Sequence, residues 1–192
     1  MNLPNRLTLV RIVLSFLLVF LLLLPGLPFK GAALCVFVAA ALTDWWDGRI
    51  ARRRGLISDF GALMDPIADK VLVLSAFGAF VLLHVAPRWM VLLIAARELL
   101  ITGLRLIALA KGKVLPAEAA GKWKATAQMV VISITLLFLV AREAYPPATC
   151  PVGNWLSLAG AGLRVLMLGV VVLTVTSGIS FLWHNRKQIV TF

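Results

Sequence analysis

The chain has 192 residues, of which 61% are hydrophobic and only 14% are charged. A soluble globular domain carries roughly 25% charged residues, so the composition excludes an ordinary soluble protein and favours a membrane protein with a single domain, residues 1–192. Lys and Arg number 19 against 8 Asp and Glu. This surplus suits an anionic lipid surface, and with so apolar a chain it argues against nucleic acid as a partner.

Six apolar segments follow one another along the chain, with Pro- and Gly-containing turns between several of them. A membrane-spanning helix needs about 20 mostly apolar residues. The first segment lacks a clear signal-peptide cleavage site, so it is interpreted as a retained helix. The sequence therefore predicts an all-α polytopic membrane protein, a six-transmembrane-helix bundle over residues 7–25, 31–53, 64–86, 89–110, 122–144 and 155–183.

Basic residues concentrate in the connections on one side of this bundle. That side would carry Arg6, Arg49, Arg52, Arg53, Arg54, Lys111, Lys113, Lys122, Lys124, Arg186 and Lys187, and the other side only Lys30, Arg88 and Arg142. By the positive-inside rule, both termini and the 49–61 and 111–124 connections are expected to face the cytoplasm. Arg164 lies within the last segment, where snorkelling or a contact with another helix is expected.

Five of the eight acidic residues fall between Asp44 and Asp69. Asp44 and Asp47 are three residues apart and Asp65 and Asp69 are four apart, so each pair shares a helix face. Helix capping is an alternative for Asp65, which precedes Pro66. It does not explain Asp44 and Asp47, because carboxylates near the C-terminus of a helix oppose the helix dipole. Four converging carboxylates need counter-charge, and all-oxygen ligation suits Mg²⁺ or Mn²⁺. A structural cluster paired with nearby arginines is the other interpretation.

The spacing of these aspartates resembles the signature of a known enzyme family. Asp44-x2-Asp47-Gly48-x2-Ala51-Arg52-x8-Gly61-x3-Asp65-x3-Asp69 is similar to the motif of the CDP-alcohol phosphotransferases. These membrane enzymes split the diphosphate of a CDP-activated lipid, transfer the lipid phosphate to an alcohol and release CMP. The resemblance implies that the four aspartates hold two divalent ions and that Asp69 is the base for the incoming hydroxyl.

The other motif residues are expected to contact the CDP-activated lipid. Gly48 and Ala51 lack bulk and let a nucleotide approach the helix closely, and Arg52 can pair with phosphate through its guanidinium. Gly61 lets the third helix approach the second, although a plain turn glycine is an equal alternative. Asp59 lies outside the motif and is expected to cap the third helix.

Charged residues in the fourth and fifth segments bear on the acceptor. Arg97, Glu98 and Arg105 stand in an apolar sequence, where ionisable groups are functional candidates because their desolvation is costly. As neighbours on one helix, Arg97 and Glu98 are not expected to face each other; a structural polar seam is the alternative for Glu98 and Arg105. Lys122 and Lys124 lie beside a helix start, which favours an anion. With Arg97 or Arg105 they could bind an acceptor that carries its own phosphate, such as glycerol 3-phosphate.

Residues 2–11, 96–105 and 121–129 are similar to the bacterial branch of this family that makes phosphatidylglycerophosphate. The resemblance implies CDP-diacylglycerol as donor, sn-glycerol 3-phosphate as acceptor, Asn5 and Thr8 as further donor contacts, and a homodimer in the bacterial inner membrane with a cytoplasmic active site. The alternatives are the same chemistry with inositol phosphate, serine or phosphatidylglycerol as acceptor, a divalent-cation transporter that uses the aspartates as ligands, or a catalytically inactive scaffold.

Overall fold

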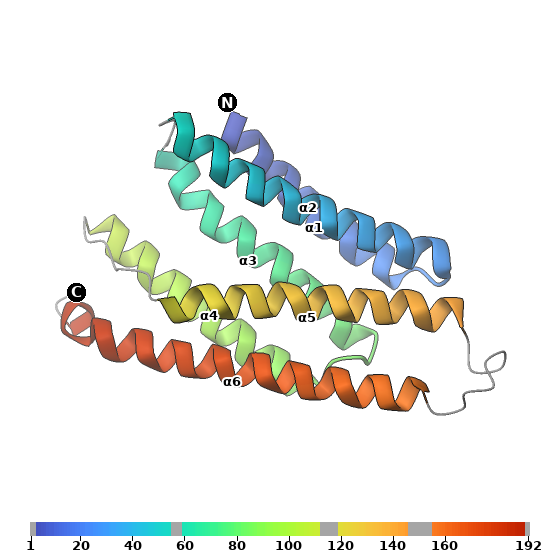
Figure 1. Cartoon of the computed structure of the whole chain (residues 1–192). Coiled ribbons are helices and arrows are strands. Elements are labelled where there is room, and N and C mark those ends of the chain that lie inside the picture. Colours follow the sequence, from blue (N-terminus) through green and yellow to red (C-terminus); the bar gives the residue numbers. More distant parts are fainter. Residues whose placement is uncertain (1–2, 55–58, 112–118, 146–154, 191–192) are drawn as a thin grey trace.

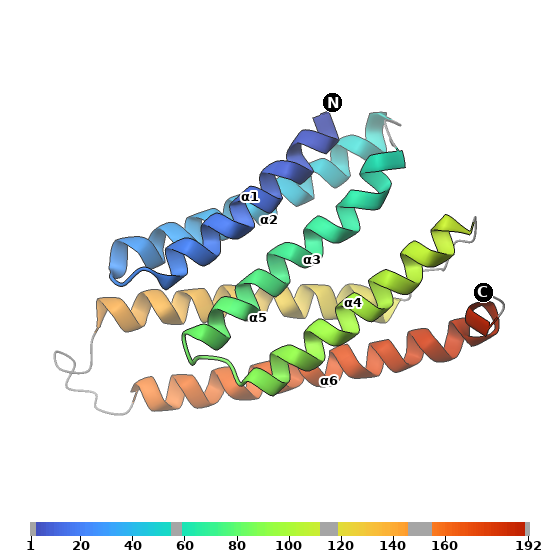
Figure 2. The same ribbon diagram turned by 180° about the vertical axis from the view of Figure 1, so that it is seen from behind.

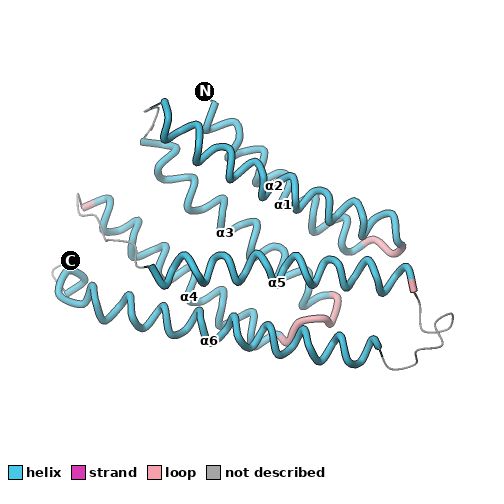
Figure 3. The backbone as a smooth tube through the Cα atoms, in the orientation of Figure 1, coloured by secondary structure: helices cyan, strands magenta, loops and turns pink. Residues whose placement is uncertain are grey.

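The computed structural model describes residues 3–54, 59–111, 119–145 and 155–190, without the side chains of residues 3–7, 44–54, 59–66, 69, 119–122 and 187–190. This part of the chain contains six helices and no strand (Figures 1 and 3). The helices are α1 (Leu3–Leu23), α2 (Leu27–Arg54), α3 (Asp59–Leu82), α4 (Arg88–Ala110), α5 (Ala119–Ala144) and α6 (Trp155–Val190). The predicted all-α fold with six helices is confirmed.

The helix bounds agree with the predicted segments most closely for α4 and least for the end of α6. The apolar pattern predicts that the last segment stops at residue 183, whereas α6 continues to Val190. The extension contains charged and polar residues but neither proline nor glycine, so nothing breaks the helix after it loses its apolar character.

The six helices lie side by side, and both termini lie at the same end of the bundle (Figures 1 and 2). That end also carries the end of α2, the start of α3, the end of α4 and the start of α5. The basic connections that were predicted to be cytoplasmic therefore gather at one end, as six antiparallel segments require. At the opposite end, Gly26 closes the α1–α2 turn with a φ of 108°, a conformation that glycine adopts without a Cβ clash.

The core runs through all six helices. Its buried side chains include Leu18, Phe37, Phe77, Ile94, Ile132 and Met167, one from each helix. Within it, the rings of Phe77 and Phe80 meet edge to face with centroids 6.2 Å apart, a favoured aromatic geometry.

Large apolar side chains also cover the outside of the bundle. Phe16 is 65% exposed, Leu92 68% and Val165 70%, and exposed apolar surface of this extent is typical of contact with a membrane or a partner. In the described part of the chain, Trp123–Ala144 and Trp155–Arg186 are long and apolar enough to cross a membrane. Thr8–Leu23, Leu27–Thr43 and Lys70–Leu82 are shorter apolar helices, so a bundle with six crossings stays a prediction.

Candidate active site

The aspartate motif falls on two consecutive helices. Asp44 and Asp47 lie in the second half of α2, and Asp65 and Asp69 lie in the first half of α3. Because both segments are helical, each pair shares a helix face, as the spacing predicts. The four side chains lie outside the described set; within that set, no three His, Cys, Asp or Glu residues gather as a metal site would require. Metal binding by the aspartates therefore stays a prediction.

The other predicted donor contacts lie on the same helices or beside them. Gly48, Ala51 and Arg52 belong to α2, Gly61 to α3 and Asn5 to α1, all with undescribed side chains. Thr8 is described and is buried on α1. In both views the start of α1 lies next to the end of α2 and the start of α3 (Figures 1 and 2). The predicted donor residues therefore share one end of the bundle.

Glu98 on α4 is the centre of a buried polar cluster. Its side chain is 1% exposed and forms ion pairs with Lys70 on α3, 3.1 Å away, and with Lys124 on α5. Lys124 also donates a hydrogen bond to Glu98 Oε1, and Gln128 Nε2 donates another to the same oxygen over 3.2 Å. A buried carboxylate needs such partners, because an unpaired charge away from water is strongly unfavourable. One glutamate thus joins three helices.

Arg97 also contacts this cluster, and here one expectation was wrong. The sequence predicts that Arg97 and Glu98, as neighbours on α4, do not face each other, yet Arg97 Nη1 lies 3.5 Å from Glu98 Oε1. The helical spacing fixes where the Cβ atoms point, but the long arginine side chain reaches around the helix to its neighbour. The cluster therefore combines three cations with one carboxylate, a formal charge of +2.

Arg97 links the cluster to α6 as well. Its Nη2 donates a hydrogen bond to Ser177 Oγ over 3.1 Å. The next residue, Gly178, leaves room for this side chain, because a Cβ at that position would lie 3.0 Å from Arg97 Cγ and 3.3 Å from its Nε. The glycine therefore serves close approach rather than backbone freedom, since a Cβ here would require the Arg97 side chain to shift.

Arg105 forms no ion pair with Glu98 among the described residues. It is exposed, and its guanidinium carbon lies 5.1 Å from the centroid of the Phe181 ring on α6, within the range of a cation–π contact. Of the four residues predicted to bind the acceptor phosphate, the structure therefore brings Arg97 and Lys124 together and places Arg105 against α6. The fourth, Lys122, lies in α5 with its side chain outside the described set.

A small cavity of about 110 Å³ adjoins the Glu98 cluster. Arg11 on α1, Lys70 on α3 and Gln128 on α5 line it. Lys70 directly follows Asp69, so the cavity and the cluster begin one residue beyond the aspartate motif on the same helix. The aspartate motif and the cationic cluster are thus adjacent along α3.

Lys70, Gln128, Ser177 and Gly178 were not among the predicted site residues. The sequence could have indicated Lys70 as well, because a lysine in an apolar run is as costly to desolvate as Arg97 or Glu98. Gln128 stands in one of the segments that carry the family resemblance. Nothing in the local sequence indicates that Ser177 and Gly178 lie beside Arg97, 80 residues earlier.

Comparison with known proteins gives one consistent result. Residues 1–176 match the family model of the CDP-alcohol phosphatidyltransferases. A CDP-diacylglycerol–glycerol-3-phosphate 3-phosphatidyltransferase of Bacillus subtilis is 39% identical over 71% of this chain and 77% of its own. A protein of the same name from Escherichia coli is 43% identical over 69% and 75%. A probable phosphatidylglycerophosphate synthase of Mycobacterium tuberculosis is 35% identical over 98% and 83%.

Proposed function

The chain belongs to the CDP-alcohol phosphatidyltransferase family, and from this premise we propose that it is a membrane phosphatidyltransferase. It transfers the phosphatidyl group of CDP-diacylglycerol to sn-glycerol 3-phosphate, giving phosphatidylglycerophosphate and CMP. The observation that carries the proposal is the full aspartate motif on α2 and α3 beside a cationic cluster on α3, α4 and α5. The names of relatives that are 35–43% identical support the same reaction.

The donor set fits two hard divalent ions. Asp44, Asp47, Asp65 and Asp69 offer only carboxylate oxygens from two helices joined by a short connection, which suits Mg²⁺ or Mn²⁺. Such ions, when bound, neutralise the charge of a diphosphate and of its leaving group.

The chain's own residues align the two substrates. Arg52 pairs with the donor diphosphate, and Gly48 and Ala51 keep the face of α2 open for the nucleotide; Asn5, Thr8 and Gly61 complete the donor contacts. The acceptor hydroxyl attacks the phosphatidyl phosphorus, CMP departs, and Asp69 accepts the hydroxyl proton. A base must lie within hydrogen-bond reach of that hydroxyl to do so.

The cationic cluster supplies the preference for an acceptor with its own phosphate. Glu98 offsets only one of the three cations that it contacts, so Lys70, Lys124 and Arg97 retain a surplus of positive charge. The carboxylate thereby holds these cations in place without neutralising the group. Arg97, Arg105, Lys122 and Lys124 are the proposed contacts of the acceptor phosphate, which charge-assisted hydrogen bonds would bind.

The proposed setting is a six-helix bundle in the bacterial inner membrane, working as a homodimer, with both termini and the active site in the cytoplasm. The gathering of both termini and the basic connections at one end of the bundle supports this orientation (Figure 1). A lipid donor can then keep its acyl chains in the bilayer while its nucleotide reaches water.

A panel of acceptors tests the proposal. Purified protein in detergent, with CDP-diacylglycerol and Mg²⁺ or Mn²⁺, is assayed for CMP release with glycerol 3-phosphate, inositol phosphate, serine and phosphatidylglycerol in turn. We expect fast CMP release with glycerol 3-phosphate and with no other acceptor of the panel. Release with another acceptor alone would assign the same chemistry to that acceptor. Metal flux into proteoliposomes without nucleotide, together with no CMP release, would favour the transporter instead.

A further inference from the structure

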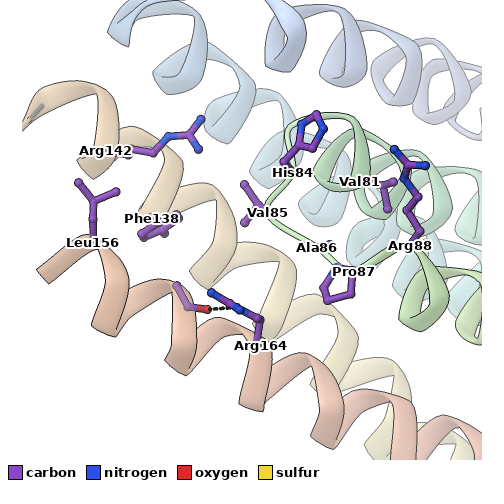
Figure 4. A pocket seen from close by; sticks show the side chains of 11 residues that line it. Val81, His84, Val85, Ala86, Pro87, Arg88, Phe138, Arg142, Leu156 and Arg164 are labelled. Carbon is purple, nitrogen blue, oxygen red and sulfur yellow. Dashed lines mark hydrogen bonds between the residues drawn. The ribbon is translucent and has the colours of Figure 1, made fainter. Parts of the chain in front are cut away.

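A second polar site lies at the end of the bundle opposite the aspartate motif. A cavity of about 470 Å³ opens between the α3–α4 turn, the end of α5 and the start of α6 (Figure 4). From Asp69 to His84 the chain covers about 20 Å at 1.5 Å per helical residue. The cavity is therefore separate from the active site proposed above.

Three arginines from three helices line this cavity. Arg88 begins α4, Arg142 lies in the last turn of α5, and Arg164 lies on α6. His84 joins them from the α3–α4 turn, and Figure 4 shows Arg142 extending from α5 toward it. The fold thus brings together cations that are as much as 76 residues apart in sequence, from Arg88 to Arg164.

These arginines make few polar contacts with the described part of the chain. In the described part of the chain, the one hydrogen bond that any of their guanidiniums makes joins Arg164 Nε to the Gly160 carbonyl over 3.4 Å, and none forms an ion pair. By contrast, Lys30 at the same end of the bundle is buried and donates to the carbonyls of Leu22, in the last turn of α1, and of Leu24, just after it.

Acidic residues are scarce around the cavity. The chain has eight, namely Asp44, Asp47, Asp59, Asp65, Asp69, Glu98, Glu118 and Glu143. Of these, Glu143 alone is near this end by sequence, and it does not line the cavity. The connection 146–154 contains no Asp or Glu either. The cavity lining therefore holds three guanidiniums and an imidazole but no carboxylate, and Glu143, next to Arg142 on α5, is the one acidic residue near it.

Helix polarity increases the positive potential. The starts of α4 and α6 both reach the cavity, through Arg88 and Leu156, and neither helix has an acidic residue in its first turn. Arg142 at the end of α5 complements the dipole of that helix, so it has an ordinary explanation. Arg88 has no such explanation, because a cation at the N-terminus of a helix opposes the helix dipole. A bound anion would resolve this conflict.

His84 has a backbone conformation that residues other than glycine rarely adopt. Its φ is 58°, in the left-handed region, and it lies two residues after the end of α3, in the turn where glycine is the usual residue. The following amides, Val85 N and Ala86 N, both donate to the carbonyl of Phe80, which fixes the turn. An imidazole kept there at a steric cost is consistent with a functional role for the turn.

We propose that this cavity binds a phosphate group, carried either by an anionic phospholipid of the outer leaflet or by a free anion. Guanidinium groups match phosphate oxygens through paired N–H donors, and the start of a helix favours a bound anion. The apolar wall formed by Val81, Phe138 and Leu156 suits a ligand with an apolar part beside its charge.

Two binding measurements on the purified full-length protein in neutral detergent test this proposal and separate the two sources. Dioleoyl phosphatidylglycerol is titrated and followed by native mass spectrometry, with dioleoyl phosphatidylcholine as the zwitterionic reference. Inorganic phosphate is titrated without lipid and followed by thermal unfolding. The variant R88Q/R164Q removes two of the three guanidiniums, and K111Q/R186Q removes two exposed charges at the other end as the matched control.

A loss of affinity of about tenfold or more in R88Q/R164Q for either probe, with K111Q/R186Q unchanged, is the expected result. Loss of lipid binding assigns the site to a headgroup, and loss of phosphate binding assigns it to a free anion. If the double variant does not elute as a single folded species, R164Q alone is measured, since Arg164 is exposed and its loss should weaken binding in the same direction. Equal binding of both probes by wild type and the variants would overturn the proposal.

Discussion

Lys124 on α5 and Glu98 on α4 form a buried ion pair 26 residues apart, which joins the two helices that carry the proposed acceptor contacts. Both side chains are almost fully buried. Two charges are removed from water together here, which is tolerable only because Lys70, Arg97 and Gln128 contact the same carboxylate. The pair itself is neutral, so its part is to hold the cluster together, while the surplus positive charge comes from Lys70 and Arg97.

Removing the carboxylate should destabilise the bundle more than removing the lysine. Glu98→Gln leaves three cations without their common partner, whereas Lys124→Met leaves Glu98 with Lys70 and Arg97. Breaking a buried pair costs about 3–5 kcal/mol, so the unfolding temperature of Glu98→Gln in detergent should fall by about 6–20 °C. Lys111→Met, at an exposed lysine, is the control. Unfolding of Glu98→Gln at the wild-type temperature would show that the cluster contributes little to the stability of the fold.

The close approach of Arg97 to α6 predicts opposite effects for two glycines on one helix. Gly178→Ala should destabilise the protein, because the new methyl group meets Arg97 Cγ at 3.0 Å and weakens its bond to Ser177. Gly169→Ala meets nothing within 4 Å and should stabilise α6 by about 0.5–1 kcal/mol through helix propensity. Thermal unfolding of both variants measures the difference. Equal stabilisation by both substitutions would mean that α6 does not pack on Arg97 in this way.

Arg105 and Arg186 form a matched pair for testing the acceptor phosphate contact. Both are exposed arginines that lie over an aromatic ring of α6, Phe181 and Trp183 respectively. Arg105→Ala should raise the apparent KM for glycerol 3-phosphate by about tenfold, the effect of one lost charge-assisted hydrogen bond, and change the KM for CDP-diacylglycerol much less. Arg186→Ala should change neither. An unchanged acceptor KM in Arg105→Ala would remove Arg105 from the phosphate site.

The proposed base makes a prediction about turnover rather than binding. Asp69→Asn should lower kcat by at least about 10²-fold, because an amide cannot accept the hydroxyl proton. Asp59→Asn changes the first residue of the same helix outside the motif and should retain activity. Near-normal turnover by a well-folded Asp69→Asn would eliminate the base role.

Removing divalent metal should stop the reaction reversibly. Four aspartates that hold two ions predict that a chelator abolishes CMP release and that Mg²⁺ or Mn²⁺ restores it. Ca²⁺, which prefers longer bonds and more ligands, serves as the contrasting ion. Transfer that continues in excess chelator would contradict the proposed metal site.

The sequence predicts the helices well because each apolar run is long and is bounded by proline, glycine or charge. It also places the aspartate pairs correctly on two helices, since their spacing of three and four residues has meaning only on a helix. One sequence-based prediction is wrong because it ignores side-chain length. The rule that neighbours on a helix do not face each other neglects the long side chain of Arg97, which reaches Glu98.

Contacts between distant helices could not be predicted from one sequence. The meeting of Glu98 with Lys70 and Lys124, or of Arg97 with Gly178, depends on helix rotation and crossing, which residue spacing does not determine. The same is true of Arg88, Arg142 and Arg164, which the sequence separates and the fold gathers around one cavity.

The most direct test of the central claim follows labelled glycerol 3-phosphate into lipid. The purified protein is incubated with CDP-diacylglycerol, Mg²⁺ and the labelled acceptor, and the label is partitioned between water and chloroform. We predict that label enters the lipid phase as phosphatidylglycerophosphate, one equivalent for each CMP released, and only when CDP-diacylglycerol is present. Label that stays in the aqueous phase while CMP is released to a different acceptor would contradict the account.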